Sequence, residues 1–241
     1  MRHIDYSFAG PAQNLAYDEL LLDHAETSSG GECLRFWESA MPFVVLGVGQ
    51  AWREEVRADE CRADGVPILR RCSAGGCVLQ GSGCLNYSLV LDQTARPGTA
   101  SIRGSYAAIL GALARAFQAR GQVMTCAGTS DLAIDEHKCS GNAQRRRKRF
   151  ILHHGTILYN TDLSLFTKYL REPTDRPEYR GSRAHREFVV NLPITAAVIR
   201  DAVLEAFNLR SPATTPDVDE ISAVEHLVAT KYALDSWNLR R

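Results

Sequence analysis

The sequence has no apolar run long enough to cross a membrane and no excess of either charge. Lysine plus arginine and aspartate plus glutamate both number 28 in 241 residues, so the chain as a whole has no electrostatic preference for DNA, RNA or anionic lipid. No window approaches the roughly 20 apolar residues of a membrane span, and the N-terminal MRHIDYSFAGPAQNL lacks the apolar core of a signal peptide. We expect a soluble, cytoplasmic protein with no nucleic-acid or membrane partner.

Cysteine is present, but not in an arrangement that a disulfide framework or a cysteine-rich zinc site requires. The seven cysteines are odd in number and contain no Cys-x-x-Cys pair, a pattern typical of a reducing compartment. We expect free and mostly buried thiols at positions 33, 61, 72, 77, 84, 126 and 139.

No repeat of fixed period and no low-complexity linker divides the chain. Its 241 residues fit within one hydrophobic core, so we predict a single domain over residues 1–241. Apolar periodicity predicts helices at about 11–25, 101–120, 162–171, 194–208 and 220–234, with a short polar helix before Gly65. Strand-like runs are CLRFWES, MPFVVLGVG, VPILRRC, CLNYSLVL, DLAI and RFILHHGTILYN. The Arg- and Pro-rich stretch 171–188 predicts an ordered loop. The mixture favours an α/β or α+β domain.

The stretch RRCSAGGCVLQGSGCLNYS, Arg70 to Ser88, joins two strand-like runs through Ser-Ala-Gly-Gly. Glycine lets the backbone approach a ligand closely, and free N–H groups beside two arginines can hold an anion. The spacing matches neither Gly-x-Gly-x-x-Gly nor the Walker P-loop. Taken alone, such a glycine-rich hairpin is more often a simple turn.

The stretch SDLAIDEHKCSGNAQ places Asp131 at the start of a strand-like run and Lys138 beyond its end, before the small residues SGNA. A lysine ahead of small residues can lie close to a carboxylate or phosphate and stabilise negative charge that develops there. An isolated Lys-x-Ser-Gly is weak evidence, because a surface lysine on a turn gives the same pattern.

The basic run RRRKR, Arg145–Arg149, precedes two adjacent histidines, His153 and His154. A nuclear-localisation or RNA-binding segment can contain such a run, but no aromatic residues are interleaved here. A solvated hairpin tip and a docking patch for an acidic partner, which steering would favour, both stay open. Neighbours on a strand face opposite sides, so the histidines form a poor metal pair, and we expect one of them in the core.

Taken together and in order, these motifs resemble one family. The lipoate-protein ligases and octanoyltransferases share a catalytic domain with the biotin ligases. They carry Arg-Arg-x-Ser-Gly-Gly-Gly and a strand ending near Asn-Tyr, then an Asp-apolar segment leading to Lys-x-Ser-Gly-x-Ala, then His-Gly-Thr-Leu-Leu. Here these read RRCSAGGCV…LNYS, SDLAI…KCSGNAQ and HHGTILY. The resemblance continues in NLAYDELLL, PEYRGSRAHREFVVNLP and KYALDSWNLRR, so it covers almost the whole chain.

The resemblance implies an α+β fold, a mixed β-sheet wrapped by helices, with the acyl chain in an apolar tunnel and its carboxyl near Lys138. In a ligase, ATP and Mg²⁺ activate free lipoate or octanoate as an acyl-adenylate, which the lysine of an acceptor lipoyl domain attacks. Lys138 is then the catalytic residue and Asp131 the candidate metal ligand. The resemblance assigns substrate and nucleotide binding to Arg70, Arg71, Ser73, Gly75, Gly76, Asn86, Asp131, Ser140, Gly141, Ala143, His154, Gly155 and Thr156.

The alternative is an octanoyltransferase, which needs no ATP because acyl-carrier protein delivers the octanoyl group as a thioester. Some enzymes of this fold form an acyl-enzyme on a cysteine. Cys126 is the candidate, and a small buried residue is the other interpretation of it. Cys139 adjoins Lys138 but points to the opposite face of a strand. A third hypothesis is a member that binds lipoyl groups or acceptors without turnover, which Lys138 and Asp131 count against. We prefer the ligase.

The sequence departs from the family pattern at three places. Ala74 replaces the first glycine of the triplet, Gln80-Gly81 stands where ligases commonly have His-Asp, and Ser130 precedes Asp131 where they commonly have asparagine. These departures put the metal and nucleotide contacts there in doubt. The Gly-Arg-Gly-Arg signature of biotin ligases is missing, so we do not expect biotin.

The partners that the resemblance implies are acceptor lipoyl domains, in 2-oxoacid dehydrogenase subunits and the glycine cleavage H protein, and acyl-carrier protein if the chain is a transferase. The sequence ends where the catalytic domain of two-domain ligases ends. That implies no C-terminal accessory domain, and hence a stand-alone domain, a separately encoded accessory partner, or a transferase that needs neither. The sequence names neither the acceptor nor the oligomeric state.

Overall fold

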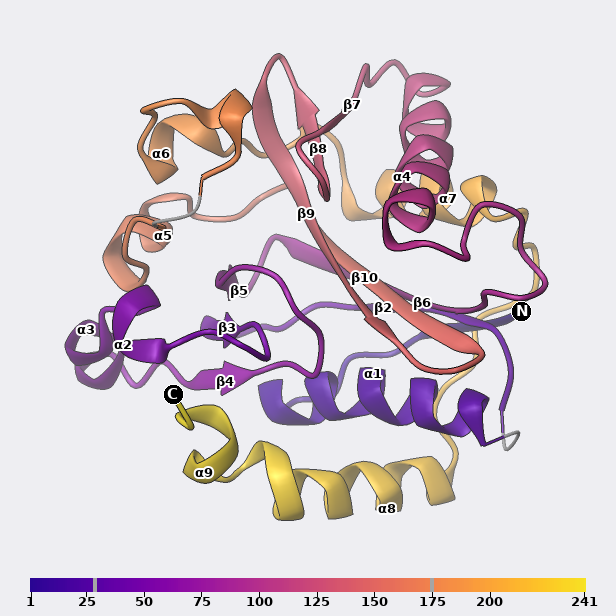
Figure 1. Cartoon of the computed structure of the whole chain (residues 1–241), viewed down its shortest axis with the longest axis horizontal. Helices are drawn as coiled ribbons and strands as arrows, with labels where there is room; N and C mark the ends of the chain where they lie inside the picture. The colour runs from indigo at the N-terminus through magenta and orange to yellow at the C-terminus, as the bar shows by residue number, and fades with distance from the viewer. Residues whose placement is uncertain (28–29, 174–175) are drawn as a thin grey trace.

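The computed structural model describes residues 1–27, 30–173 and 176–241, and Figure 1 shows its arrangement. The strands are β1 (Arg2–Asp5), β2 (Cys33–Trp37), β3 (Phe43–Leu46), β4 (Ile68–Arg70), β5 (Val78–Gln80), β6 (Cys84–Asp92), β7 (Thr125–Ala127), β8 (Asp131–Ile134), β9 (His137–Arg146) and β10 (Phe150–Leu158). The helices are α1 (Pro11–Glu26), α2 (Trp52–Glu55), α3 (Ala58–Ala63), α4 (Ile102–Gln118), α5 (Ser164–Tyr169), α6 (His185–Phe188), α7 (Ala196–Ala206), α8 (Val218–Leu227) and α9 (Asp235–Asn238), with a 3₁₀ turn η1 (Glu178–Arg180) and a π-helical turn η2 (Val228–Tyr232).

The strands form two sheets. The large sheet has the order β1-β2-β6-β10-β9-β8-β7, in which β1 and β2 are parallel and the other neighbours antiparallel. In the small sheet, β4 and β5 both pair with β3. The glycine-containing segment between β4 and β5 therefore crosses over β3, and our prediction of a hairpin turn there was wrong.

Helices cover both faces of the large sheet (Figure 1). On one face α4 and α7 pack onto the sheet through Leu113, Phe117 and Val203, and on the other α1 packs through Leu22 while the segment after α8 contributes Tyr232. A third apolar cluster joins the small sheet to α3, α5 and α6. The predicted mixed sheet wrapped by helices is confirmed.

The predicted helices lie close to their expected positions, with two differences. The polar helix before Gly65 is divided into α2 and α3. The helix expected at 220–234 is divided into α8 and η2, and α9 follows it. The predicted ordered loop 171–188 includes residues 174 and 175, which lie outside the described residues, and its described part carries η1 and α6. No helix in the part of the chain that the structure describes is long and apolar enough to span a membrane. All seven cysteines are described and are free, five of them buried.

The basic run Arg145–Arg149 covers the last two residues of β9 and the turn before β10. Four of its arginines have partners within the chain: Arg145 donates to the Cys72 carbonyl at 2.9 Å, Arg146 to the Thr99 carbonyl at 2.7 Å, and Arg147 and Arg149 pair with Asp23 and Asp92 at 2.5 and 2.7 Å. These contacts hold the turn to α1 and to the end of β6. The docking patch for an acidic partner stays a prediction, because Arg149 is 59% exposed even in its ion pair with Asp92.

His153 is the core histidine that the sequence led us to expect. It is fully buried, the Gln144 side-chain amide donates to its Nδ1 at 2.9 Å, and its Nε2 lies 3.2 Å from the Tyr87 hydroxyl. Burial lowers the pKa of His153 to about 3, helped by the charge of His154. The folded protein therefore holds this imidazole neutral throughout the range in which an exposed histidine titrates.

The buried imidazole makes stability fall as the pH falls. Between pH 6.5 and about 3 the unfolded state binds one proton more at His153 than the folded state, so the free energy of unfolding decreases by roughly 1 kcal/mol per pH unit. We expect the His153→Gln variant to show a shallower decrease than wild type between pH 6.5 and 4, measured by urea unfolding. Equal slopes for the two proteins would contradict a neutral His153.

Candidate active site

Two adjoining cavities lie between the large and small sheets and meet at Lys138. The inner cavity, about 130 Å³, lies among α1, β6, β9, β10 and the segment after β4. The outer cavity, about 570 Å³, extends toward α5 and α6. The residues that line both are Gly75, Gly76, Cys77, Val78, Ser130, Asp131 and Lys138. Lys138 therefore faces both cavities, and it is the cationic side chain among the residues that the two described linings share.

Lys138 is held by a carboxylate from the neighbouring strand. Its Nζ lies 2.8 Å from Oδ1 of Asp131, which is the first residue of β8. A Cβ at Gly141 would lie 2.9 Å from Cε of Lys138, so a larger residue at Gly141 would push the lysine aside. The Lys138 side chain is about one quarter exposed, and its ammonium group can donate to a carboxylate or phosphate that enters the cavity.

The loop after β4 is shaped by the second of the two arginines. The Arg71 guanidinium donates to the carbonyls of Ala74 at 2.6 Å and Gly76 at 2.9 Å. Gly75 has a φ of +94°, which an alanine adopts only with strain, and a Cβ at Gly47 would lie 2.0 Å from the Gly75 carbonyl oxygen. The loop thus has one fixed shape. The side chain of Ala74 is exposed and is not among the groups that line either cavity.

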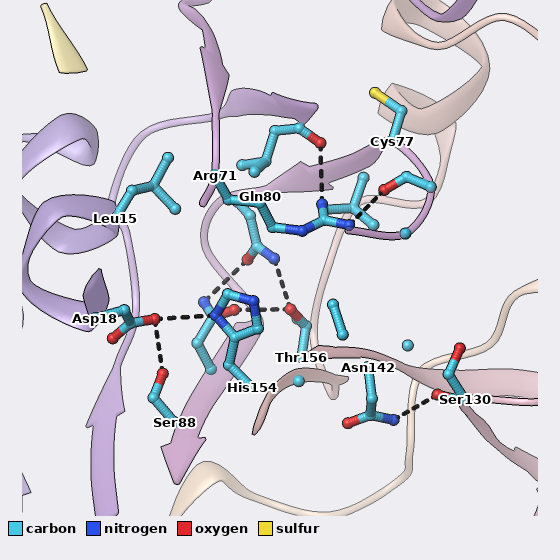
Figure 2. A pocket seen from close by; sticks show the side chains of 18 of the residues that line it. Leu15, Asp18, Arg71, Cys77, Gln80, Ser88, Ser130, Asn142, His154 and Thr156 are labelled. Atoms are coloured by element: carbon cyan, nitrogen blue, oxygen red, sulfur yellow. Dashed lines mark hydrogen bonds and ion pairs between the residues drawn. The ribbon is translucent and has the colours of Figure 1, made fainter. Parts of the chain in front are cut away.

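The far end of the inner cavity contains a buried carboxylate (Figure 2). Asp18 lies 2.7 Å from the Arg35 guanidinium, accepts from the Ser88 hydroxyl at 2.7 Å, and lies 3.2 Å from Nδ1 of His154. Nε2 of His154 lies 2.6 Å from the hydroxyl of Ser73. The Ser73 hydroxyl also accepts from Nε of Arg71, so this hydroxyl links the loop after β4 to His154.

One wall of the inner cavity is a closed ring of hydrogen bonds (Figure 2). The Gln80 amide donates to the Thr156 hydroxyl at 2.5 Å, the hydroxyl donates to Oδ1 of Asn86 at 2.7 Å, and the Asn86 amide donates back to Oε1 of Gln80 at 2.9 Å. Each member holds the next, so the wall is rigid before any ligand arrives. Gln80, the departure from the family pattern, is part of this ring.

Comparison with known proteins decides the family. The profile described as "Lipoyl protein ligase A/B catalytic domain" matches residues 10–208. The chain belongs to this family. Its members attach lipoyl or octanoyl groups to proteins, so this chain is an enzyme of the lipoate ligase and octanoyltransferase family, as the motifs predicted.

The chain is similar both to octanoyltransferases and to lipoate-protein ligases. Octanoyltransferase LipM of Brevibacillus brevis is 27% identical over 274 residues, covering 100% of this chain and 99% of LipM. A putative lipoate-protein ligase A of Schizosaccharomyces pombe is 31% identical over 207 residues, covering 85% of this chain and 54% of that protein. Among solved structures, a bi-partite lipoate protein ligase of Thermoplasma acidophilum, described with its E2 lipoyl domain, is 25% identical with a TM-score of 0.84 over 99% of this chain and 95% of that one.

The cavities of this lipoyl ligase family member contain most of the residues that the sequence singled out. The predicted residues that line the inner cavity are Arg71, Gly75, Gly76, Asn86, Asp131, Lys138, Gly141, Ala143, His154, Gly155 and Thr156. Ser73 and Ser140 are buried behind it. Ser73 supports His154, and the Ser140 hydroxyl accepts from the Asn142 amide at 3.3 Å.

Arg70 is the clearest correction to the predicted ligand-binding set. It is fully buried, and the residues of the two cavities that the structure describes do not include it. Its guanidinium donates to backbone carbonyls of Gly47, Gln50, Trp237 and Asn238. Since successive strand residues point to opposite faces, only Arg71 faces the site, while Arg70 secures α9 against the turn after β3.

Cys126, the candidate nucleophile of an octanoyltransferase, is not among the described residues that line the two cavities. It is paired with Leu132 on β8, which is fully buried beneath α4, and directly paired residues share a face. Asp131, the neighbour of Leu132, points instead to Lys138. The Cys126 side chain is exposed, so the interpretation as a small buried residue was wrong, and desolvation raises its pKa against the opposing charge of Arg115. The role of Cys126 as an acyl-enzyme nucleophile stays a prediction.

Sequence analysis missed several polar groups of the inner cavity, above all Asp18. The stretch NLAYDELLL indicates that Asp18 is buried. It stands three residues after Leu15 and four before Leu22, on the apolar stripe of α1. A carboxylate in that stripe is buried, and a buried carboxylate has a partner. The other missed lining residues include Cys77, Ser88, Ser130 and Asn142.

Proposed function

We propose that this family member is a lipoate-protein ligase, which activates a free lipoyl acid with ATP and transfers the acyl group to the lysine of an acceptor lipoyl domain. The observation that carries the proposal is the position of Lys138 where a narrow inner cavity meets a wide outer one. The inner cavity suits an acyl chain and the outer cavity a nucleotide. A structure of the same fold is described as lipoate-protein ligase A bound with ATP, at 23% identity.

In the proposed mechanism, formation of the acyl-adenylate and transfer of the acyl group both take place beside Lys138. First an oxygen of the acid carboxylate attacks the α-phosphorus and pyrophosphate leaves; then the acceptor amine attacks the acyl carbon, AMP leaves, and the amine loses its proton. Negative charge gathers near the same oxygens in both steps, where the ammonium of Lys138 donates to it. The fixed loop at Gly75 and Gly76 supplies backbone beside the phosphates, and the ring of Gln80, Asn86 and Thr156 holds the acyl pocket in shape.

Two carboxylates of the outer cavity fit the magnesium ion that accompanies ATP. Asp131 and Glu55 line the outer cavity, and no group of three or more His, Cys, Asp and Glu side chains in the described residues could hold a metal ion by itself. Magnesium is commonly held by one or two carboxylates together with substrate phosphates. Asp131 is our candidate ligand, and the ion would neutralise charge on the departing pyrophosphate.

Exchange of labelled pyrophosphate into ATP tests the proposal, because only an enzyme that forms an acyl-adenylate catalyses it. We expect exchange that depends on added lipoate or octanoate and is absent without the acid. Transfer of an octanoyl group from acyl-carrier protein, with no exchange under any acid, would overturn the proposal. It would favour the second candidate, an octanoyltransferase, which the LipM similarity over the full chain supports.

The ligase and the octanoyltransferase differ in whether the sulfur of Cys126 carries an acyl group during the reaction. In a ligase the adenylate is already activated, so Cys126→Ser is expected to keep the wild-type transfer rate and to change stability by about a kcal/mol or less. Mass spectrometry of wild type with octanoyl-carrier protein checks the same point. An octanoyl adduct on Cys126 that hydroxylamine releases would establish the transferase.

The acceptors we propose are lipoyl domains of 2-oxoacid dehydrogenase subunits and the glycine cleavage H protein. The similar Thermoplasma acidophilum ligase is described as bi-partite and with its E2 lipoyl domain, which supports both this acceptor class and a separately encoded accessory protein. Addition of such an accessory protein is a second arm of the exchange experiment.

A further inference from the structure

A tyrosine from a distant segment completes the site at Lys138. The Tyr179 hydroxyl, in η1, donates to Oδ2 of Asp131 at 2.8 Å, although the two residues are 48 positions apart. The other carboxylate oxygen, Oδ1, is held by Lys138 at 2.8 Å. We infer that Tyr179 is a positioning residue, which fixes the Asp131 carboxylate and through it the direction of the Lys138 ammonium. The inference rests on the proposed role of Lys138.

The ring of Tyr179 cannot easily leave this position. It packs against Phe188, with centroids 5.1 Å apart, and a Cβ at Gly128, where φ is +55°, would lie 3.5 Å from the ring. The Arg183 guanidinium donates to the backbone carbonyls of both Tyr179 and Glu136. The turn that carries the tyrosine is therefore tied to the β7–β8 turn and to the β8–β9 turn, on either side of Asp131.

The Tyr179 hydroxyl determines which oxygen of the Asp131 carboxylate pairs with Lys138. The Tyr179 hydroxyl has one proton, and it donates this proton to Oδ2 of Asp131. With Oδ2 occupied, only Oδ1 of Asp131 faces Lys138, and the remaining N–H groups of the ammonium point into the cavities. Without the hydroxyl, the carboxylate is free to rotate and to turn both oxygens onto the ammonium, which withdraws the lysine from the substrate carboxyl.

The chain offers a matched control for removing this hydroxyl. Tyr169 donates to Oδ2 of Asp64 at 2.7 Å, and Nζ of Lys168 lies 2.6 Å from the same oxygen. This second group of a tyrosine, an aspartate and a lysine belongs to α5 and its surroundings and contributes no residue to the described linings of the two cavities. Tyr169→Phe therefore deletes an equivalent hydrogen bond away from the site.

The test is the rate of acyl transfer to an acceptor lipoyl domain by Tyr179→Phe and Tyr169→Phe. A hydrogen bond to a charged group corresponds to roughly a tenfold effect or more, so we expect kcat of Tyr179→Phe to fall about tenfold, with the KM for ATP and for lipoate within about twofold of wild type. Tyr169→Phe is expected to keep the wild-type kcat. A kcat of Tyr179→Phe within twofold of wild type would overturn the inference, and so would an equal fall in both variants.

A double-mutant cycle shows whether Tyr179 acts through Asp131. In an Asp131→Ala background, Tyr179→Phe is expected to cause no further loss, because its partner is gone; a further tenfold loss would show an independent role and contradict the inference. If Tyr179→Phe does not fold, Arg183→Gln tests the same link by releasing the turn, with the same expected fall in kcat. A wild-type kcat for that variant would also overturn the inference.

The readout separates this inference from the proposed function. Transfer to the acceptor is measured with lipoate plus ATP and, in parallel, with octanoyl-carrier protein. If only the thioester supports transfer, the ligase proposal fails, and the comparison of Tyr179→Phe with Tyr169→Phe is then made with that donor.

Discussion

The Lys138→Ala variant is expected to lose acyl transfer, with a rate ~10²–10³ below wild type. Lys138 is the cationic side chain at the junction of the two cavities, and its loss leaves the charge on the acid and phosphate oxygens without its closest donor. The free energy of unfolding is expected to change by less than about 1 kcal/mol, because the ion pair with Asp131 is partly exposed and such pairs contribute little.

Single-turnover transfer of the acyl group to an acceptor domain measures the rate, and urea unfolding measures the stability. Lys168→Ala is the control, because Lys168 also forms an ion pair with an aspartate, Asp64, but on the surface. We expect Lys168→Ala to transfer at the wild-type rate. Activity of Lys138→Ala within a few-fold of wild type would remove Lys138 from the mechanism, for either acyl donor.

Much of the site was predictable because its motifs are short and local. Asp131 and Lys138 lie on adjacent strands of one hairpin, β8 and β9, so seven residues of sequence bring them together. His154, Gly155 and Thr156 follow on β10, which pairs with β9. A meander of consecutive strands keeps residues that are near in sequence near in space, and the resemblance assigned roles to those residues in the same order.

The remaining parts depend on long-range packing, which sequence pattern does not contain. Arg70 and Arg71 are adjacent and chemically identical, and only the insertion of β3 between β4 and β5 decides that one faces the cavity and the other the C-terminal segment. Tyr179 lies in a stretch with no helical or strand period, so nothing local indicates that its hydroxyl reaches Asp131. The dense positive charge of residues 145–149 was visible in the sequence, but the acidic partners of Arg147 and Arg149, Asp23 and Asp92, lie far away in the chain.

The Asp18→Ala variant is expected to lose about 3–5 kcal/mol of stability, because it leaves the guanidinium of Arg35 buried and without its carboxylate. Both side chains of this pair are at most 1% exposed. The control is Asp59→Ala, which breaks the ion pair with Arg62 between two exposed side chains and should change stability by no more than a few tenths of a kcal/mol. Urea unfolding at pH 7 measures both.

The pH dependence of stability is a second test of the role of Asp18. Burial opposes the charge of Asp18, but Arg35, His154 and Ser88 outweigh it and hold its pKa below the usual value of 3.8. A carboxylate with a lowered folded pKa stabilises the fold fully above the unfolded pKa, and that contribution is lost as the pH falls below about 3.8 toward the folded value. Wild type should therefore lose the stabilisation that Asp18 provides only below about pH 4. The difference in free energy of unfolding between wild type and Asp18→Ala should become smaller there. If wild type and Asp18→Ala differ in free energy of unfolding by as much at pH 2.5 as at pH 7, then packing around the side chain, and not its charge, stabilises this end of the inner cavity.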